Sequence, residues 1–222
     1  MKMVWWKYIC VILLFYVYVG GLLMPIPHQP ILYETARNLY FHVPLWFAMI
    51  FLLVISVWYA IQYLRKGNMD YDLQSVELAN TGLVFGILGF ITGAIWGNYT
   101  WGSPLPQDPK LLSTEIAMLI YLAYWVLRGS FRDNQQRARI SAVYNIFAFA
   151  AFIPLTIILP RLTPNSLHPG NGGNPGFKIY DSEHTMKLVF YPAIIAMILL
   201  GYWISSLRIR YRRLNAIVED NS

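Results

Sequence analysis

Long apolar runs separated by short polar links make up most of this chain. A helix needs about 20 apolar residues to cross the hydrocarbon core of a bilayer, and the runs are close to that length. The fourth run is the shortest, although Tyr121 and Trp125 suit a membrane interface. The pattern predicts an all-α membrane protein, a bundle of six transmembrane helices in a single domain over residues 1–222. The expected spans cover about residues 4–23, 42–63, 77–96, 113–128, 139–159 and 187–207.

The composition supports a membrane protein over a soluble one. Apolar residues make up 57% of the chain and charged residues only 13%, whereas a soluble domain carries about 25% charged residues. The net charge of +6 does not indicate nucleic acid, because the basic residues lie between the apolar runs instead of forming one stripe. The chain has one cysteine, Cys10, so no internal disulfide, CxxC zinc pattern or CxxCH heme-attachment motif is present.

The distribution of basic residues orients the predicted bundle. Most of the 17 lysines and arginines precede the first span or follow the second, fourth and sixth spans. Because basic loops stay in the cytoplasm, both termini are predicted to be cytoplasmic. The first run is longer than the apolar part of a signal peptide and no small-residue cleavage site follows it, so we expect it to be retained. The outer loops then cover about residues 24–41, 97–112 and 160–186, and their proline, glycine and aromatic content is typical of loops that carry function.

All four histidines lie in or at the edges of these outer loops. His42 stands at the outer end of the second span, and His168 stands in a glycine-rich part of the third outer loop. Considered alone, His42 is more readily interpreted as a polar helix cap and His168 as an incidental loop residue. As a pair on separate loops, they are also suited to bind one heme iron from opposite sides. His28 and His184 are either substitute ligands or solvated loop residues.

The second outer loop, residues 96–113, offers further binding groups. Trp96 and Trp101 form a flat apolar platform, Lys110 is suited to pair with a carboxylate such as a heme propionate, and Asp108 is suited to orient Lys110 or a loop amide. An aromatic belt at the membrane interface is the competing interpretation. The chain shows no phosphate-binding loop, dinucleotide fingerprint or nucleophile elbow.

These motifs resemble those of CcmC, the heme-handling subunit of bacterial cytochrome c maturation, in the CcmC/CcsA "WWD" superfamily. The resemblance extends from about Tyr33 to the sixth span. The family's IHVP segment is similar to Phe41-His42-Val43-Pro44, and its TLHQG segment is similar to Ser166-Leu167-His168-Pro169-Gly170. The frame of its loop WGxxxWGxWWxWDxRLTSE is kept by Trp96-Gly97, Trp101-Gly102, Asp108, Lys110, Leu111 and Ser113-Thr114-Glu115.

The resemblance implies a heme-binding protein of the bacterial inner membrane with its functional loops on the periplasmic side. His42 and His168 would be the axial ligands of a non-covalently bound heme b, and the tryptophan-containing loop would present that heme. The partners implied are a CcmE-type heme chaperone, a CcmAB-type ABC transporter and a small CcmD-type subunit, together with membrane lipid and without nucleic acid. The resemblance implies a protein that handles heme and has no catalytic residue, not an enzyme. A lyase-like role that assists heme attachment stays open.

The centre of the tryptophan-containing loop departs from the family pattern. Pro104, Leu105 and Gln107 stand where the family has further tryptophans, which removes flat aromatic surface. Lys110 replaces an arginine, so the charge is kept while bidentate geometry is lost. These departures keep two alternatives open: a CcsA-like component that attaches heme to cytochrome c, and a non-heme membrane scaffold or small-solute carrier.

Overall fold

The regular structure of this protein is a bundle of long helices. The computed structural model describes residues 4–26, 32–162 and 184–220. Within these ranges, six helices are long and apolar enough to cross a membrane, and this confirms the predicted all-α six-span architecture. The helices are α1 (Trp5–Leu23), α2 (Leu39–Lys66), α3 (Met69–Trp101), α4 (Pro109–Gly129), α5 (Asn134–Ile153) with its extensions η2 (Pro154–Ile158) and α6 (Leu159–Leu162), and α8 (His184–Asp220), and the short helix η1 (Tyr33–Asn38) precedes α2.

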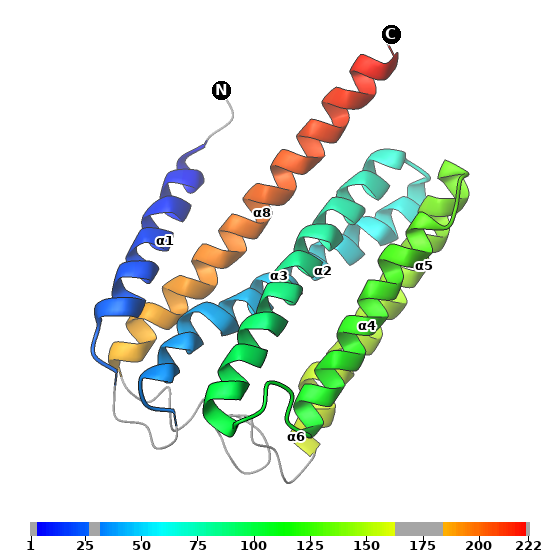
Figure 1. Ribbon diagram of the computed structural model, residues 1–222. Coiled ribbons are helices and arrows are strands. Elements are labelled where there is room, and N and C mark those ends of the chain that lie inside the picture. Colours follow the sequence, from blue (N-terminus) through cyan, green and yellow to red (C-terminus); the bar gives the residue numbers. More distant parts are fainter. Residues whose placement is uncertain (1–3, 27–31, 163–183, 221–222) are drawn as a thin grey trace.

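The two ends of the bundle differ. The start of α1 and the end of α8 lie at one end, which we call the terminal end (Figure 1). The opposite end, which we call the loop end, holds the starts of α2, α4 and α8 and the end of α3. The charge bias predicts that the terminal end is cytoplasmic.

The closest packing in the bundle joins α2 and α3 along a row of glycines. Four glycines of α3 face four larger side chains of the antiparallel α2, and the missing side chains let the two backbones approach closely. A Cβ at Gly86 would lie 2.5 Å from Sδ of Met49, and a Cβ at Gly93 would lie 2.7 Å from Cε1 of His42. The facing pairs are Gly82 with Leu53, Gly86 with Met49, Gly89 with Trp46, and Gly93 with His42.

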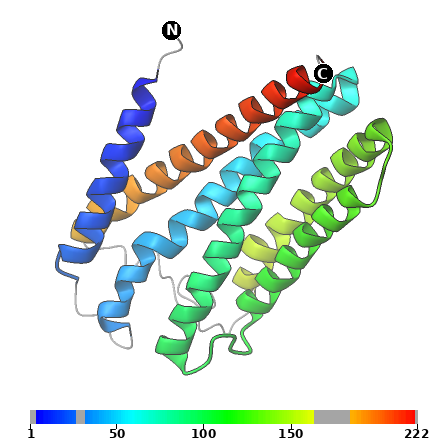
Figure 2. The ribbon, with the colours of Figure 1, turned by 45° about the horizontal axis from the view of Figure 1, so that its top comes forward.

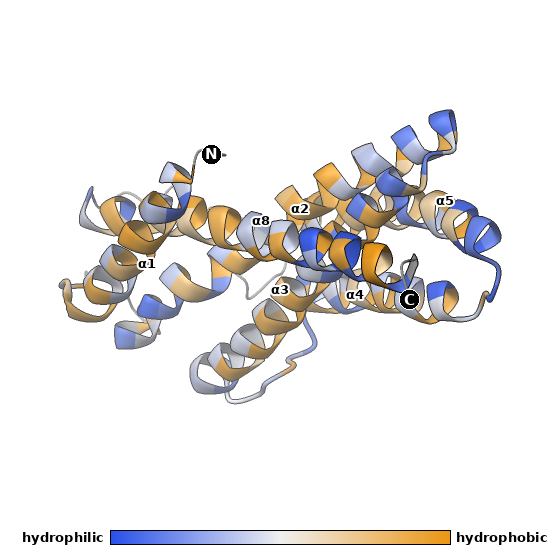
Figure 3. Cartoon of the chain, turned by 90° about the horizontal axis from the view of Figure 1, so that it is seen from above, coloured by the Kyte–Doolittle hydropathy of each residue, from blue (hydrophilic) through white to orange (hydrophobic). Residues whose placement is uncertain are grey.

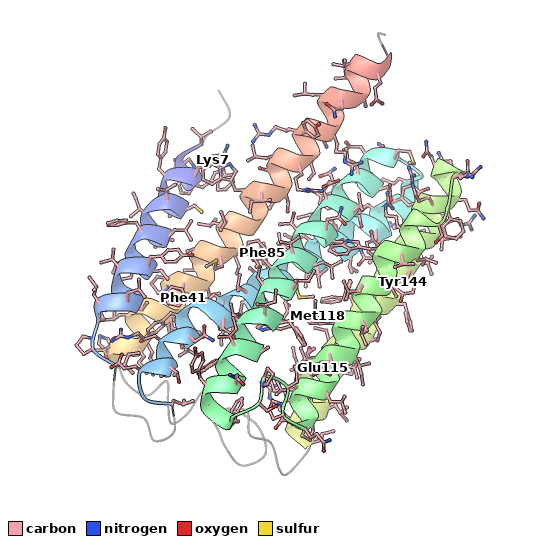
Figure 4. All side chains as sticks on the ribbon, viewed as in Figure 1. Lys7, Phe41, Phe85, Glu115, Met118 and Tyr144 are labelled. Carbon is pink, nitrogen blue, oxygen red and sulfur yellow. The ribbon has the colours of Figure 1, made fainter. Side chains whose placement is uncertain are left out.

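The remaining helices pack on both sides of this pair. α8 contacts α1, α2 and α3, whereas α4 packs mainly against α5 and touches α3 over only a short stretch. Phe85 of α3 and Met118 of α4 belong to the largest buried apolar cluster, and they lie in the middle of the bundle (Figure 4). The α4–α5 pair therefore meets the α2–α3 pair mainly where α5 packs on α2.

The outer surface of the bundle is suited to lipid. Large apolar side chains point outward along every long helix; Phe15, for example, is 71% exposed and Val126 is 73% exposed. Viewed from the terminal end, hydrophilic residues gather toward the helix ends while hydrophobic residues follow the helix lengths (Figure 3). Water would penalise this much exposed apolar surface, whereas a hydrocarbon environment does not.

The tryptophan-containing outer loop is shorter than expected. Residues 96–113 were predicted as a loop, but α3 continues to Trp101 and α4 already begins at Pro109. The helix stops where Gly102 adopts a left-handed conformation with a φ of 74°, which glycine tolerates without strain. The segment between the two helices is therefore 102–108, and both predicted tryptophans of the site belong to α3.

Candidate functional site

His42 lies between α2 and α3 near the loop end of the bundle. It sits in the first turns of α2, and only 7% of its surface is exposed. Its ring is packed against the backbone of Gly93 on α3, where any larger residue would collide with it. The position of this imidazole is thus set by the α2–α3 glycine row and not by a flexible loop.

A hydrogen bond to Thr92 favours one tautomer of His42. Nδ1 of His42 lies 3.1 Å from Oγ1 of Thr92. The hydroxyl of Thr92 also faces the carbonyl oxygens of Leu88 and Gly89, at 2.9 and 3.0 Å, and its single proton is donated to these acceptors. Oγ1 is then left to accept a proton from Nδ1, so the neutral imidazole keeps its lone pair on Nε2. A neutral imidazole in this tautomer is a ligand for a metal through Nε2.

Two tryptophans surround the His42 ring edge-on. The ring centroids of His42 and Trp96 are 5.9 Å apart, and those of His42 and Trp46 are 6.3 Å apart, each pair at a steep angle. Nε1 of Trp96 donates a hydrogen bond to Oγ1 of Thr35 at 3.2 Å, which ties the indole to η1. The structure therefore brings His42 and Trp96 together, while Trp101 lies one turn further along α3, beside Gly97.

Asp108 is the N-cap of α4. Its carboxylate accepts hydrogen bonds from the backbone amides of Lys110 and Leu111, at 2.9 and 3.3 Å, and only 3% of the residue is exposed. A capping carboxylate stabilises the first turn of a helix and fixes where the helix begins. The amides that Asp108 orients belong to the first turn of α4, and its carboxylate also interacts electrostatically with Lys110.

One basic side chain lies near His42, and a second lies near the first. Lys110, in the first turn of α4, is close enough to His42 to interact with it electrostatically, and Arg161 of α6 interacts in the same way with Lys110. Arg161 was not singled out from the sequence, because it follows a long apolar run and no local motif marks it. Thr92 and Gly93 were also missed, although the regular glycine spacing on α3 indicates which face meets another helix.

The other predicted residues are less informative. His28 and His168 lie outside the described residues. His184 is the first residue of α8 and is exposed. Pro104, Leu105 and Gln107, where the loop departs from the family pattern, are all exposed on the segment between α3 and α4. Their side chains face outward at the loop end and do not contribute to the buried core.

Comparison with known proteins assigns the family. A family model described as "Heme exporter protein C" matches residues 1–220. Heme exporter protein C of Rhodobacter capsulatus is 25% identical over 192 residues, which cover 83% of this chain and 77% of that protein. The Paracoccus denitrificans protein of the same name is 25% identical over 202 residues with the same coverage. A cytochrome c biogenesis protein CcsA of Thermosynechococcus vestitus is 39% identical over 76 residues, or 33% of this chain and 24% of that protein. The chain belongs to the heme exporter protein C family.

Proposed function

We propose that this protein binds heme at the loop end of the bundle and delivers it to a heme chaperone for cytochrome c biogenesis. The observation that carries this function is the His42 ring, which is held by Thr92 with its Nε2 lone pair available as a ligand. Heme is inferred as the cargo because the relatives are named heme exporter proteins. Heme iron accepts neutral imidazole as an axial ligand.

The surrounding residues fit the rest of a heme molecule. Trp96 contributes aromatic surface beside His42, where an apolar macrocycle gains contact area. Lys110 and Arg161 are cations suited to the two carboxylates that heme carries. His168 is the proposed second axial ligand, on the strength of its motif, and would complete a non-covalent bis-histidine heme b.

This role requires binding and release but no catalytic residue. The protein's own residues hold the cargo and exclude water from His42, and covalent attachment is left to a partner. The proposed partners are a CcmE-type chaperone, a CcmAB-type ABC transporter and a CcmD-type small subunit. In this proposal the loop end faces the periplasmic side of the bacterial inner membrane, in line with the charge bias of the loops.

A second candidate function is heme attachment by a CcsA-like component. The local identity to CcsA proteins, 39% over a third of the chain in one case, is the observation that favours it. The two functions differ in their need for a chaperone. Cytochrome c formation in cells that express this chain without a CcmE-type protein would support attachment, and no formation would support delivery.

Heme titration of the purified protein in lipid nanodiscs tests the binding step. We expect saturable binding by the unaltered chain and a strong loss of affinity in His42→Gly. His184→Gly is the matched control, because His184 is exposed at the start of α8. Equal binding by His42→Gly and the unaltered chain would refute the assignment of His42. No heme binding by the unaltered chain would instead favour a scaffold or solute carrier.

A further inference from the structure

A concave site lies near the terminal end, away from His42. It is a cleft of about 660 Å³ between α3, α4, the start of α5 and α8, and this size is typical of ligand sites. In Figure 2, α3 (teal to green) stands between α8 (orange to red) and the α4–α5 pair (green to yellow-green). The lining residues are Val76, Asn80, Thr81, Val84, Phe85, Trp125, Arg128, Gly129, Arg137, Ile204, Arg208 and Arg212.

The walls of this cleft change from apolar to basic toward the terminal end. On α8, Ile204 is followed at helical spacing by Arg208 and Arg212, which lie progressively nearer the terminal end. On α4, Trp125 is followed by Arg128 in the last turn. The deeper part of the α3 wall includes Phe85. A ligand that matches this gradient has an apolar body toward the middle of the membrane and an anionic group at its surface.

Buried carboxylates hold the arginines of the cleft in place. Asp72 binds Arg128, with 2.6 Å between Oδ2 and Nη2. Glu77 is fully buried and contacts two arginines: Nε of Arg208 at 2.5 Å and Nε of Arg212 at 3.1 Å. An ionisable residue buried within a transmembrane helix is costly and is usually retained for a function.

The cleft has positive charge in excess of what these carboxylates neutralise. Four arginines line it, and Asp72 and Glu77 are the carboxylates that contact them within the described ranges, which leaves an excess of two positive charges. Arg137 donates to the neutral side-chain oxygen of Asn134. Arg208 and Arg212 remain 47% and 59% exposed, so their guanidinium groups are accessible to a further anion.

We propose that this cleft is a specific binding site for an anionic phospholipid of the surrounding leaflet, preferentially one with two phosphates. The head-group phosphates contact Arg137, Arg208 and Arg212, and the acyl chains lie along Phe85 and Ile204. Guanidinium groups bind phosphate strongly and with defined geometry. Basic pockets between transmembrane helices on the cytoplasmic side are suited to such head groups. This site is separate from the proposed heme site and does not depend on it.

Lipid binding by the purified protein in detergent tests this site. The probes are cardiolipin, phosphatidylglycerol and phosphatidylcholine with identical oleoyl chains, together with inorganic phosphate. Native mass spectrometry measures retained lipid, and the apparent Tm reports stabilisation by the bound probe. We expect cardiolipin to be retained most strongly and to raise the apparent Tm most, phosphatidylglycerol to do so less, and phosphatidylcholine and inorganic phosphate to have little effect. The assignment would be overturned if phosphatidylcholine were retained as well as cardiolipin, or if inorganic phosphate raised the apparent Tm as much as cardiolipin does.

Arginine variants then locate the site. Because each arginine contributes about fivefold to anionic lipid affinity, Arg208→Gln/Arg212→Gln should weaken binding roughly 30-fold. Arg210→Gln/Arg213→Gln is the matched control, since it removes the same charge from the same helix outside the cleft. Equal weakening by both double variants would indicate general surface attraction and refute a specific site.

Two further arms keep the test decisive. Arg137→Gln removes a cleft charge without breaking an ion pair among the described residues, and it replaces the double variant if that protein does not fold. Its expected effect is about fivefold, against none for Arg210→Gln. Heme that displaced cardiolipin equally from the unaltered chain and from His42→Gly would assign the cleft to a tetrapyrrole dicarboxylate and overturn the lipid assignment.

Discussion

Nδ1 of His42 lies 3.1 Å from the hydroxyl oxygen of Thr92, and this contact joins α2 to α3. The hydroxyl proton is directed to backbone carbonyls of α3, and this arrangement favours the tautomer with Nε2 unprotonated. In the proposed heme site, Thr92 would thus prepare His42 as a ligand, as outer-shell partners of metal-binding histidines do.

Replacing Thr92 tests this contact. Thr92→Val keeps the shape of the side chain but removes the acceptor for Nδ1, and we expect heme affinity to fall about 10- to 100-fold. Thr92→Ser keeps the hydroxyl and should bind heme nearly as well as the unaltered chain. Titrations of the heme Soret band would measure both affinities. Unchanged affinity in Thr92→Val would show that the hydrogen bond does not prepare His42.

Gly93 tests whether close packing positions the imidazole. A Cβ at Gly93 would lie 2.7 Å from Cε1 of His42, so Gly93→Ala must displace the ring or the helix. We expect a marked loss of heme occupancy in purified protein, measured from the absorbance of its pyridine complex. Gly129→Ala is the control, because a Cβ at that helical glycine meets nothing within 4 Å. Equal occupancy in the two variants would contradict the packing argument.

Two variants of Asp108 separate the effect of helix capping from the effect of its negative charge. Asp108→Ala removes the acceptor for two backbone amides, and we expect it to destabilise the protein by about 1 kcal/mol. Asp108→Asn keeps a capping oxygen without the negative charge, so its stability and heme content should stay close to those of the unaltered chain. Apparent Tm and heme content report the two effects. A large loss of heme in a stable Asp108→Asn protein would show that the charge itself acts on the cargo.

The buried ion pair between α3 and α4 should matter more than an exposed one. Asp72→Asn leaves the largely buried Arg128 without its carboxylate, at an expected cost of about 3–5 kcal/mol. Asp70→Asn breaks the exposed pair with Arg213, for which about 0–1 kcal/mol is expected. Thermal unfolding in the same detergent compares them. Similar apparent Tm values for the two variants would count against a stabilising role of the buried pair.

The sequence predicted the number and order of the helices, but not their full lengths. Hydropathy indicates apolar segments, and it placed Asp70, Asp72 and Glu77 at or before the edge of the third span. The structure includes all three in α3, which begins after the N-cap Asn68, and arginines of α4 and α8 pair with them. Such partners are distant in the chain, so their pairing depends on helix packing that no local pattern reports.

The candidate site was predicted in part. His42 was found from its motif and from the clustering of histidines, and Trp96 lies beside it as the heme hypothesis requires. Thr92 and Arg161 were not found, because their roles depend on which helix faces meet. The proposed second ligand, His168, lies outside the described residues, and its role stays a prediction.

The absorption spectrum of the purified protein, oxidised and reduced, tests heme binding by this chain most directly. Two histidine ligands predict a low-spin spectrum with a sharp Soret band and resolved bands in the reduced state. His42→Gly/His168→Gly should contain no heme, and added imidazole should partly restore it by replacing the missing ligands. Unchanged heme content and an unchanged spectrum in that double variant would contradict the binding of heme between His42 and His168.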